Sequence, residues 1–164
     1  MARPSIVNIT DGIGIETVPP ERSGEVADMA EPIYREVYAR NPKKRVDWFL
    51  STYQSPESIR EQILSGTVYG FIVLHDERVG YVAYAEDSEG MYLSKLYLQR
   101  DYRGTGIGGH ILDYVEGEAR KKGIGSMHLE VNQYNTRSQE FYEKHGFVET
   151  ERIDEYRVVM RKEL

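Results

Sequence analysis

The stretch LYLQRDYRGTGIGGHILDYVEGEARKKG, residues 96–123, joins an apolar, strand-like run to an amphipathic helix through a glycine-rich turn. Four glycines fall within the six residues from Gly104 to Gly109, where the helix is expected to begin. Backbone N–H groups at a helix N-terminus point outward and carry the positive end of the helix dipole, and glycine lets a ligand approach them closely. The stretch therefore predicts a phosphate-binding turn, with a plain flexible turn as the alternative.

Composition limits the class of protein. The 164 residues, 40% of them hydrophobic, suit one domain spanning residues 1–164. The chain has no cysteine, which excludes disulfides, thiolate metal ligands and a cysteine nucleophile, and we expect no metal site. A net charge of −6 disfavours nucleic acid as a partner. No run approaches the roughly 18 apolar residues of a membrane span, so we expect a cytoplasmic protein without membrane contact.

The N-terminal part of the chain predicts one strand and two helices. The strand spans residues 13–18, and the helix after it carries an apolar face formed by Val26, Met29, Ala30, Ile33 and Val37. Pro32 removes a backbone hydrogen bond, so we expect a kink or a break there. The second helix follows the N-cap Ser55 and ends before Gly66. The aromatic segment 41–54 between the helices is expected to be irregular.

The remainder predicts strands on both sides of the glycine turn. Three antiparallel strands lead into it, the first two as a hairpin, at residues 67–75, 79–86 and 91–98. One face of the following helix holds the apolar residues Ile107, Ile111, Val115 and Ala119. The last elements are a strand, a short helix and a pair of strands, at residues 126–131, 137–145 and 147–162. This order predicts a mixed α/β or α+β domain.

A dinucleotide-binding turn is one alternative for the glycines. Gly104, Gly106 and Gly109 satisfy the pattern G-x-G-x-x-G, and Glu130 lies 21 residues later, where such folds place a ribose-binding acid. However, residues 99–103 separate the strand from the first glycine, and the strands before the turn form a hairpin instead of a βαβ unit. We therefore rank this interpretation below the first.

A second stretch, LEVNQYNTRSQEFYEKHGF at residues 129–147, adds a strand, a polar loop with Asn135 and a helix with Tyr142. With it, the chain resembles the GCN5-related N-acetyltransferase (GNAT) superfamily. The acyl-coenzyme A signature of that family matches Arg103, Gly106 and Gly108, and its downstream asparagine and tyrosine match Asn135 and Tyr142. The resemblance implies a central mixed, mostly antiparallel sheet of about six to seven strands flanked by about four helices. It also implies direct acetyl transfer from acetyl-CoA to a primary amine in a ternary complex.

The resemblance assigns the coenzyme contacts to specific residues. It places acyl-CoA between the strand before the turn and the next strand, with the main chain of Leu96 and Leu98 pairing with the pantetheine arm and the thioester carbonyl. The pyrophosphate falls at Arg103, Gly104, Gly106, Ile107, Gly108 and Gly109. Asn135 either bonds the pantetheine arm or caps the next helix. Ser138 adds a further contact.

The resemblance also suggests catalytic residues. Tyr142 matches the tyrosine that hydrogen-bonds the sulfur and protonates the departing thiolate, a role that a phenol suits, although it is also one of 13 tyrosines and could only pack. Glu130 is the first candidate for the base, because some family members place a glutamate twelve residues before the tyrosine. The alternatives are an ordered water chain as the base and Glu130 as an ordinary exposed strand residue. We interpret all four histidines as structural.

The acceptor amine is less well defined. The segments YLSKLYL and VVMRKEL are similar to a bacterial branch that includes spermidine acetyltransferases. An acidic rim that attracts polycations is predicted from the helical spacing of Glu21, Glu25, Asp28, Glu57 and Glu61, although these carboxylates could equally be solvated helix faces. The acceptor could be a small amine, a polyamine, a protein N-terminus or a lysine. Whether the protein forms a homodimer also stays open. A non-catalytic acyl-CoA-binding regulatory domain is the alternative function.

Overall fold

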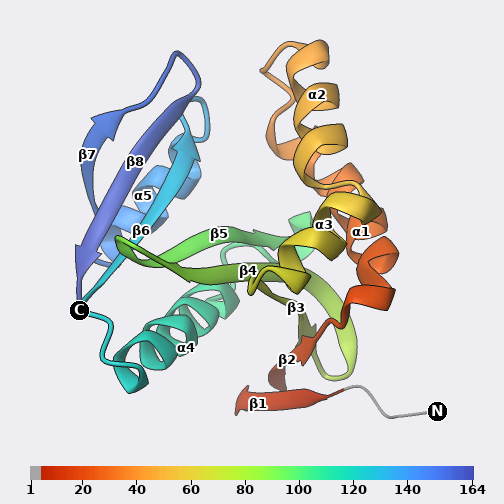
Figure 1. Cartoon of the computed structure of the whole chain (residues 1–164), viewed down its shortest axis with the longest axis vertical. Coiled ribbons are helices and arrows are strands. Elements are labelled where there is room, and N and C mark those ends of the chain that lie inside the picture. Colours follow the sequence, from red (N-terminus) through yellow and green to blue (C-terminus); the bar gives the residue numbers. More distant parts are fainter. Residues whose placement is uncertain (1–4) are drawn as a thin grey trace.

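The computed structural model describes residues 5–164, which form eight strands and five α-helices (Figure 1). The strands are β1 (Ile6–Thr10), β2 (Ile13–Thr17), β3 (Val68–Leu74), β4 (Glu77–Asp87), β5 (Gly90–Leu98), β6 (Ser126–Asn132), β7 (Val148–Arg152) and β8 (Arg157–Glu163). The helices are α1 (Ser23–Val37), α2 (Lys43–Tyr53), α3 (Pro56–Leu64), α4 (Ile107–Lys121) and α5 (Thr136–Lys144). None of these helices is long and apolar enough to cross a membrane.

The strands form one sheet in the order β1-β2-β3-β4-β5-β6-β8-β7, in which β5 and β6 are the parallel neighbours and the others are antiparallel. Helix α4 covers one face, and α1, α2 and α3 gather at the other (Figure 1). The predicted stripe of α4 is buried in the core with strand residues such as Met91 and Leu129. On the opposite face, Val26 and Ala30 of α1 pack on Phe71. The predicted mixed fold is therefore confirmed.

Local signals located several elements correctly. The side chain of Ser55 accepts a hydrogen bond from the backbone N–H of Ser58, which confirms it as the N-cap of α3. The hairpin between β3 and β4 turns through two residues with positive φ, His75 at 48° and Asp76 at 68°. Positive φ at both positions of a two-residue loop matches the right-handed twist of the flanking strands.

The structure differs from the expectations at three places in the N-terminal part. Residues 43–53 form helix α2 instead of an irregular segment, and this helix buries Val46 and Leu50 beside tyrosines of α1. Helix α1 is continuous through the exposed Pro32, so of the expected kink or break the break is absent. The strand at residues 6–10 was not expected. With this strand and the helix at 43–53, the described residues hold eight strands and five α-helices where six to seven and four were expected.

Candidate active site

The sheet opens between its two parallel strands. Strands β5 and β6 pair at two positions, Met91 opposite Met127 and Tyr92 opposite His128. Strand β6 keeps pairing with β8 along its whole length, so β6, β8 and β7 turn away from β5 together (Figure 1). The second half of β5 therefore presents backbone groups toward a gap, where an extended ligand can pair with them as a strand would.

A groove of about 740 Å³ lies at this gap, and we call it the glycine-turn groove. It brings together ten of the predicted residues: Leu96, Leu98, Arg103, Gly104, Gly106, Gly108, Gly109, Asn135, Ser138 and Tyr142. The exception among the predicted coenzyme contacts is Ile107, whose side chain is buried in the core beneath α4. Ile107 can therefore offer a ligand only its backbone N–H in the first turn of the helix.

The glycine turn leaves the N-terminus of α4 uncovered. Gly104 and Gly106 have φ values of 73° and 90°, a left-handed conformation that favours glycine. Gly106 is the N-cap of α4, no side chain caps the helix, and its first turn holds no acidic residue. A Cβ at Gly106 would meet nothing within 4 Å. The N–H groups that begin the helix therefore face open space, as an anion site at a helix N-terminus requires.

Arg103 is engaged inside the protein. Its guanidinium donates to the backbone oxygen of Leu98 at 2.9 Å and forms two hydrogen bonds with Glu36 of α1, at 3.0 and 2.9 Å. These bonds tie the end of β5 to α1. Arg103 therefore lines the wall of the glycine-turn groove, but most of its N–H groups already donate hydrogen bonds within the protein.

A cation that the sequence analysis did not select also lines the groove. Arg137 lies in the first turn of α5, where a positive charge opposes the helix dipole, and this unfavourable placement is the signal that was overlooked. His110 and His145 line the same groove. By contrast, His128 lies within 2.9 Å of the carboxylate of Asp87. Residues 5–164 contain no group of three or more His, Asp or Glu side chains placed to hold a metal ion.

Helix α5 supplies the remaining predicted side chains. The side-chain oxygen of Asn135 accepts a hydrogen bond from the backbone N–H of Ser138 at 3.1 Å, which makes Asn135 the N-cap of α5. Tyr142 is buried at the wall of the groove, with its ring edge-on to Phe141 and Phe147. Burial raises the pKa of the Tyr142 phenol, so it keeps its proton at neutral pH. Within residues 5–164, no hydrogen bond uses this hydroxyl.

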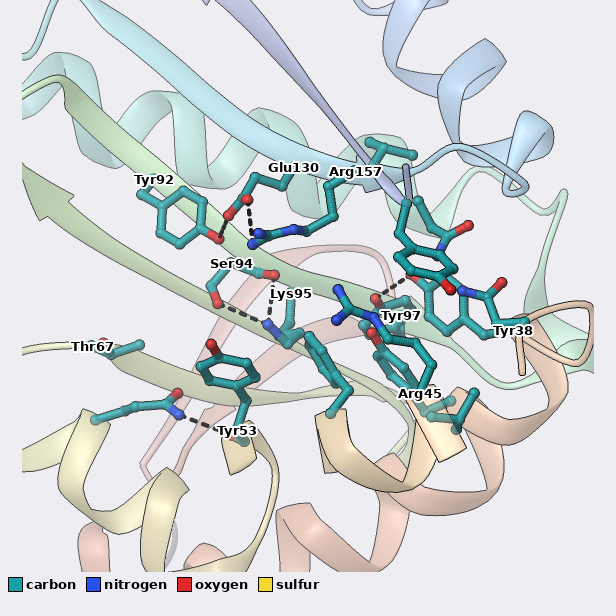
Figure 2. A pocket seen from close by; sticks show the side chains of 18 of the residues that line it. Tyr38, Arg45, Tyr53, Thr67, Tyr92, Ser94, Lys95, Tyr97, Glu130 and Arg157 are labelled. Carbon is teal, nitrogen blue, oxygen red and sulfur yellow. Dashed lines mark hydrogen bonds and ion pairs between the residues drawn. The ribbon is translucent and has the colours of Figure 1, made fainter. Parts of the chain in front are cut away.

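A second cavity of about 340 Å³, here called the aromatic pocket, lies on the other side of β5. Its aromatic lining consists of Tyr34, Tyr38, Phe49, Tyr53, Tyr92, Tyr97 and Tyr156. Figure 2 shows charged side chains directed into it from α2, β5, β6 and β8: Arg45, Lys95, Glu130 and Arg157. Tyr97 lines both cavities, and its hydroxyl lies 2.6 Å from that of Tyr38. The two cavities therefore meet at Tyr97.

A β-bulge directs Lys95 into the aromatic pocket. On β4, Ala83 pairs with Lys95 while the next residue, Tyr84, pairs with Leu93, so Ser94 is an extra residue in β5. Strict alternation along β5 would place Lys95 on the α4 face with Leu93, whereas the bulge turns it to the opposite face. A bulge of this kind is a common device for aiming a side chain at a functional site.

Lys95 is buried in the aromatic pocket, with 9% of its surface exposed. Its Nζ donates to the backbone oxygen and the Oγ of Ser94, both at 3.1 Å, and lies 5.3 Å from the centre of the Phe49 ring. Burial lowers the pKa of Lys95 to about 8, and the negative charge of Glu130 acts in the opposite direction. The pocket thus holds an ammonium group that is poorly solvated.

Glu130 is held at the wall of the aromatic pocket by two neighbours. Its carboxylate accepts a hydrogen bond from the Tyr92 hydroxyl at 2.9 Å and pairs with Arg157 at 3.0 Å. Arg157 also pairs with Asp154 at 3.0 Å. The predicted base therefore reaches the same cavity as Lys95, whereas Tyr142 reaches the glycine-turn groove on the other side of Tyr97.

The predicted acidic rim does not reach the aromatic pocket. Its lining includes none of Glu21, Glu25, Asp28, Glu57 and Glu61. Glu25 pairs instead with Arg22 at 2.7 Å and Arg78 at 2.8 Å, and these hydrogen bonds lower the pKa of Glu25 to about 2. This carboxylate is therefore neutralised within the protein, away from either cavity.

Comparison with known proteins now identifies the family. Residues 34–159 match the family model of the acetyltransferase (GNAT) domain, which covers most of the chain. The protein therefore belongs to the GNAT acetyltransferase family. The family resemblance in the sequence is thus confirmed.

Individual relatives agree with this family. An uncharacterised N-acetyltransferase of Mycobacterium tuberculosis is 43% identical over 75 residues, which are 44% of this chain and 48% of that protein. The match thus spans about half the length of the curated relative. The PaiA N-acetyltransferase of Thermoplasma acidophilum, solved with coenzyme A, superposes with a TM-score of 0.82 at 22% identity over 93% of this chain and 99% of that one. A GNAT acetyltransferase of Staphylococcus aureus gives 0.71 at 19% identity, over 93% and 99%. Both superpositions show the shared fold.

Proposed function

We propose that this protein transfers an acetyl group from acetyl-CoA to a primary amine by direct attack in a ternary complex. The observation that carries the proposal is the opening between β5 and β6 next to the uncapped N-terminus of α4. That arrangement suits an extended ligand with phosphates at one end. The coenzyme A named for the Thermoplasma relative is such a ligand. The aromatic pocket on the other side of β5 is left for the amine.

The glycine-turn groove offers binding groups in the order that acetyl-CoA needs. The backbone N–H groups of residues 106–109 would hold the pyrophosphate, with Arg137 as a nearby cation. The backbone of β5 at Leu96 and Leu98 would pair with the pantetheine arm. A backbone N–H there would also stabilise the negative charge that develops on the thioester oxygen during attack.

Two side chains, one on each side of Tyr97, would donate and accept the protons that the reaction transfers. The amine nitrogen attacks the acetyl carbon, the carbon–sulfur bond breaks, and coenzyme A leaves as a thiolate. Tyr142 would donate its proton to that thiolate, because its buried phenol stays protonated at neutral pH. Glu130 would accept the proton that the amine loses, directly or through water. The carboxylate of Glu130 also gives the incoming ammonium group a counter-ion.

The proposal is tested by turnover with a panel of amines. The chain has no cysteine, so a thiol reagent reports only the coenzyme A that is released, without background from the protein. We expect release that depends on the amine, together with an acetylated product in the mass spectrum. Tight binding of acetyl-CoA without turnover of any amine would favour the non-catalytic binding module. Absence of acetyl-CoA binding would overturn the assignment of the groove.

A further inference from the structure

We propose that the acceptor carries a carboxylate beside its amine, as a small amino acid does, and that Lys95 and Arg45 bind this carboxylate in the aromatic pocket. This inference rests on the proposed acetyl transfer and adds the chemical class of the acceptor. It differs from the polyamine acceptor suggested by the sequence.

The charges in the aromatic pocket carry the inference. Three cationic side chains and one carboxylate line it: Arg45, Lys95, Arg157 and Glu130. Arg157 pairs with Glu130, whereas Lys95 and Arg45 have no carboxylate partner within residues 5–164. Two positive charges are therefore uncompensated. A polycation would be repelled here, whereas an anion would be attracted.

Of the two cations without a carboxylate partner, Lys95 supports the inference more strongly than Arg45. An ammonium group has three N–H donors, and both hydrogen bonds of Lys95 go to the neighbouring Ser94. Burying a charge without a counter-ion is costly, and the bulge at Ser94 places this one in the pocket wall instead of in solvent. A ligand carboxylate would supply the missing negative charge.

Arg45 is positioned by two aromatic rings. Its guanidinium lies 4.7 Å from the centre of the Trp48 ring and 4.7 Å from that of Tyr156. Stacking on ring faces leaves the N–H groups at the edge of the guanidinium available for a planar carboxylate. Figure 2 shows Arg45 and Lys95 directed toward the same space, with Glu130 across from them.

The pocket also matches such an acceptor in size and in charge distribution. A volume of about 340 Å³ is at the small end for ligand sites and suits a single small molecule. Glu130 would receive the ammonium group, Lys95 and Arg45 the carboxylate, and the aromatic walls an apolar side chain. The pocket therefore complements a zwitterion.

Matched pairs of acceptors test the inference. Phenylalanine and phenylalaninamide, and alanine and alaninamide, differ in the charge of the carboxyl end, and their rates are compared per unprotonated amine because the amide also lowers the pKa of the neighbouring amine. We expect kcat/KM to favour each acid over its amide by about 10- to 100-fold, the range of a hydrogen bond to a charged group. Lys95→Met and Arg45→Gln should each reduce this preference by about 10-fold. Lys44→Met removes an exposed cation of α2 that does not line the pocket, and it should leave the preference unchanged.

The outcomes separate this inference from the proposed function. Acetylation of amides as fast as of acids would overturn the carboxylate site and leave acetyl transfer intact. A preference for O-phosphoethanolamine over every amino acid would overturn it as well. If no amine is acetylated, calorimetric titration of N-acetylphenylalanine and its amide into the protein with coenzyme A decides the matter. Selective binding of the acid, lost in Lys95→Met, would support the carboxylate site, and equal binding would refute it.

Discussion

Replacing Lys95 by methionine should stabilise the protein at neutral pH, and the gain should vanish in alkali. Burial lowers the pKa of Lys95 from 10.5 to about 8. Because one pKa unit corresponds to about 1.4 kcal/mol, the buried ammonium costs about 3 kcal/mol of folding free energy below pH 8. Methionine has a similar length and no charge, so it removes this cost.

The pH dependence of the stability difference between the two proteins shows whether the buried ammonium group of Lys95 causes it. Between pH 8 and 10.5 the unfolded chain keeps the proton on Lys95 while the folded protein releases it, so the wild-type stability gains a positive contribution as pH rises. Below pH 8 both states are protonated and the full penalty is present. The advantage of Lys95→Met should therefore be constant up to about pH 8 and then shrink toward zero by pH 10.5.

Urea unfolding of both proteins at several pH values between 7 and 10.5 measures this difference directly. Tyrosines of the unfolded chain also ionise at about pH 10, but this contribution is common to both proteins and cancels in the comparison. A packing defect caused by methionine would add an offset that does not change with pH. A stability difference that is the same at every pH would refute the claim that Lys95 is buried as an uncompensated charge.

The remaining predictions concern the reaction. Tyr142→Phe should lower kcat by about 10- to 1,000-fold with little change in acetyl-CoA affinity, and unimpaired kcat would make Tyr142 a packing residue. Gly106→Glu should weaken acetyl-CoA binding by about 10-fold or more relative to Gly106→Ala. The alanine variant is the control, because it carries the same backbone strain without the charge. Equal affinities of the two variants in calorimetry would refute the anion site. Glu130→Gln should lower kcat by about 100-fold or more if Glu130 takes the proton, and normal turnover would leave that role to water. The preference for acids over amides in kcat/KM should fall as pH rises through about 8, where Lys95 loses its charge, and a flat profile would contradict the role of Lys95.

Local signals explain which parts of the fold the sequence predicted. Gly104 and Gly106 mark a turn because only glycine readily adopts their positive φ, and Ser55 marks a helix start because its side chain caps the backbone. Helix α2 lacks such signals. It begins after Pro42 without a side-chain cap, and its first residues are lysines that oppose the helix dipole. Packing of Val46 and Leu50 against α1 stabilises it, which local sequence does not reveal.

The sequence patterns singled out most residues that line the glycine-turn groove, whereas among the charged residues of the aromatic pocket they singled out Glu130 alone. Most residues of the glycine-turn groove lie on two short stretches with recognisable spacing, and Glu36 and Val37 of α1 complete the lining. Lys95, by contrast, reaches the aromatic pocket only because the register between β4 and β5 shifts at Ser94, a property of the sheet. Arg45 lies in the helix that was not expected. The charge of the aromatic pocket therefore became visible only in three dimensions.

A crystal structure with bound acetyl-CoA tests the central claim most directly. The claim predicts the pyrophosphate at the N–H groups that begin α4 and the pantetheine arm between β5 and β6. It also predicts the thioester sulfur within hydrogen-bond distance of the Tyr142 hydroxyl, with the acetyl group at Tyr97, where the two cavities meet. Acetyl-CoA bound outside the gap between β5 and β6, or with its acetyl group directed away from the aromatic pocket, would contradict it.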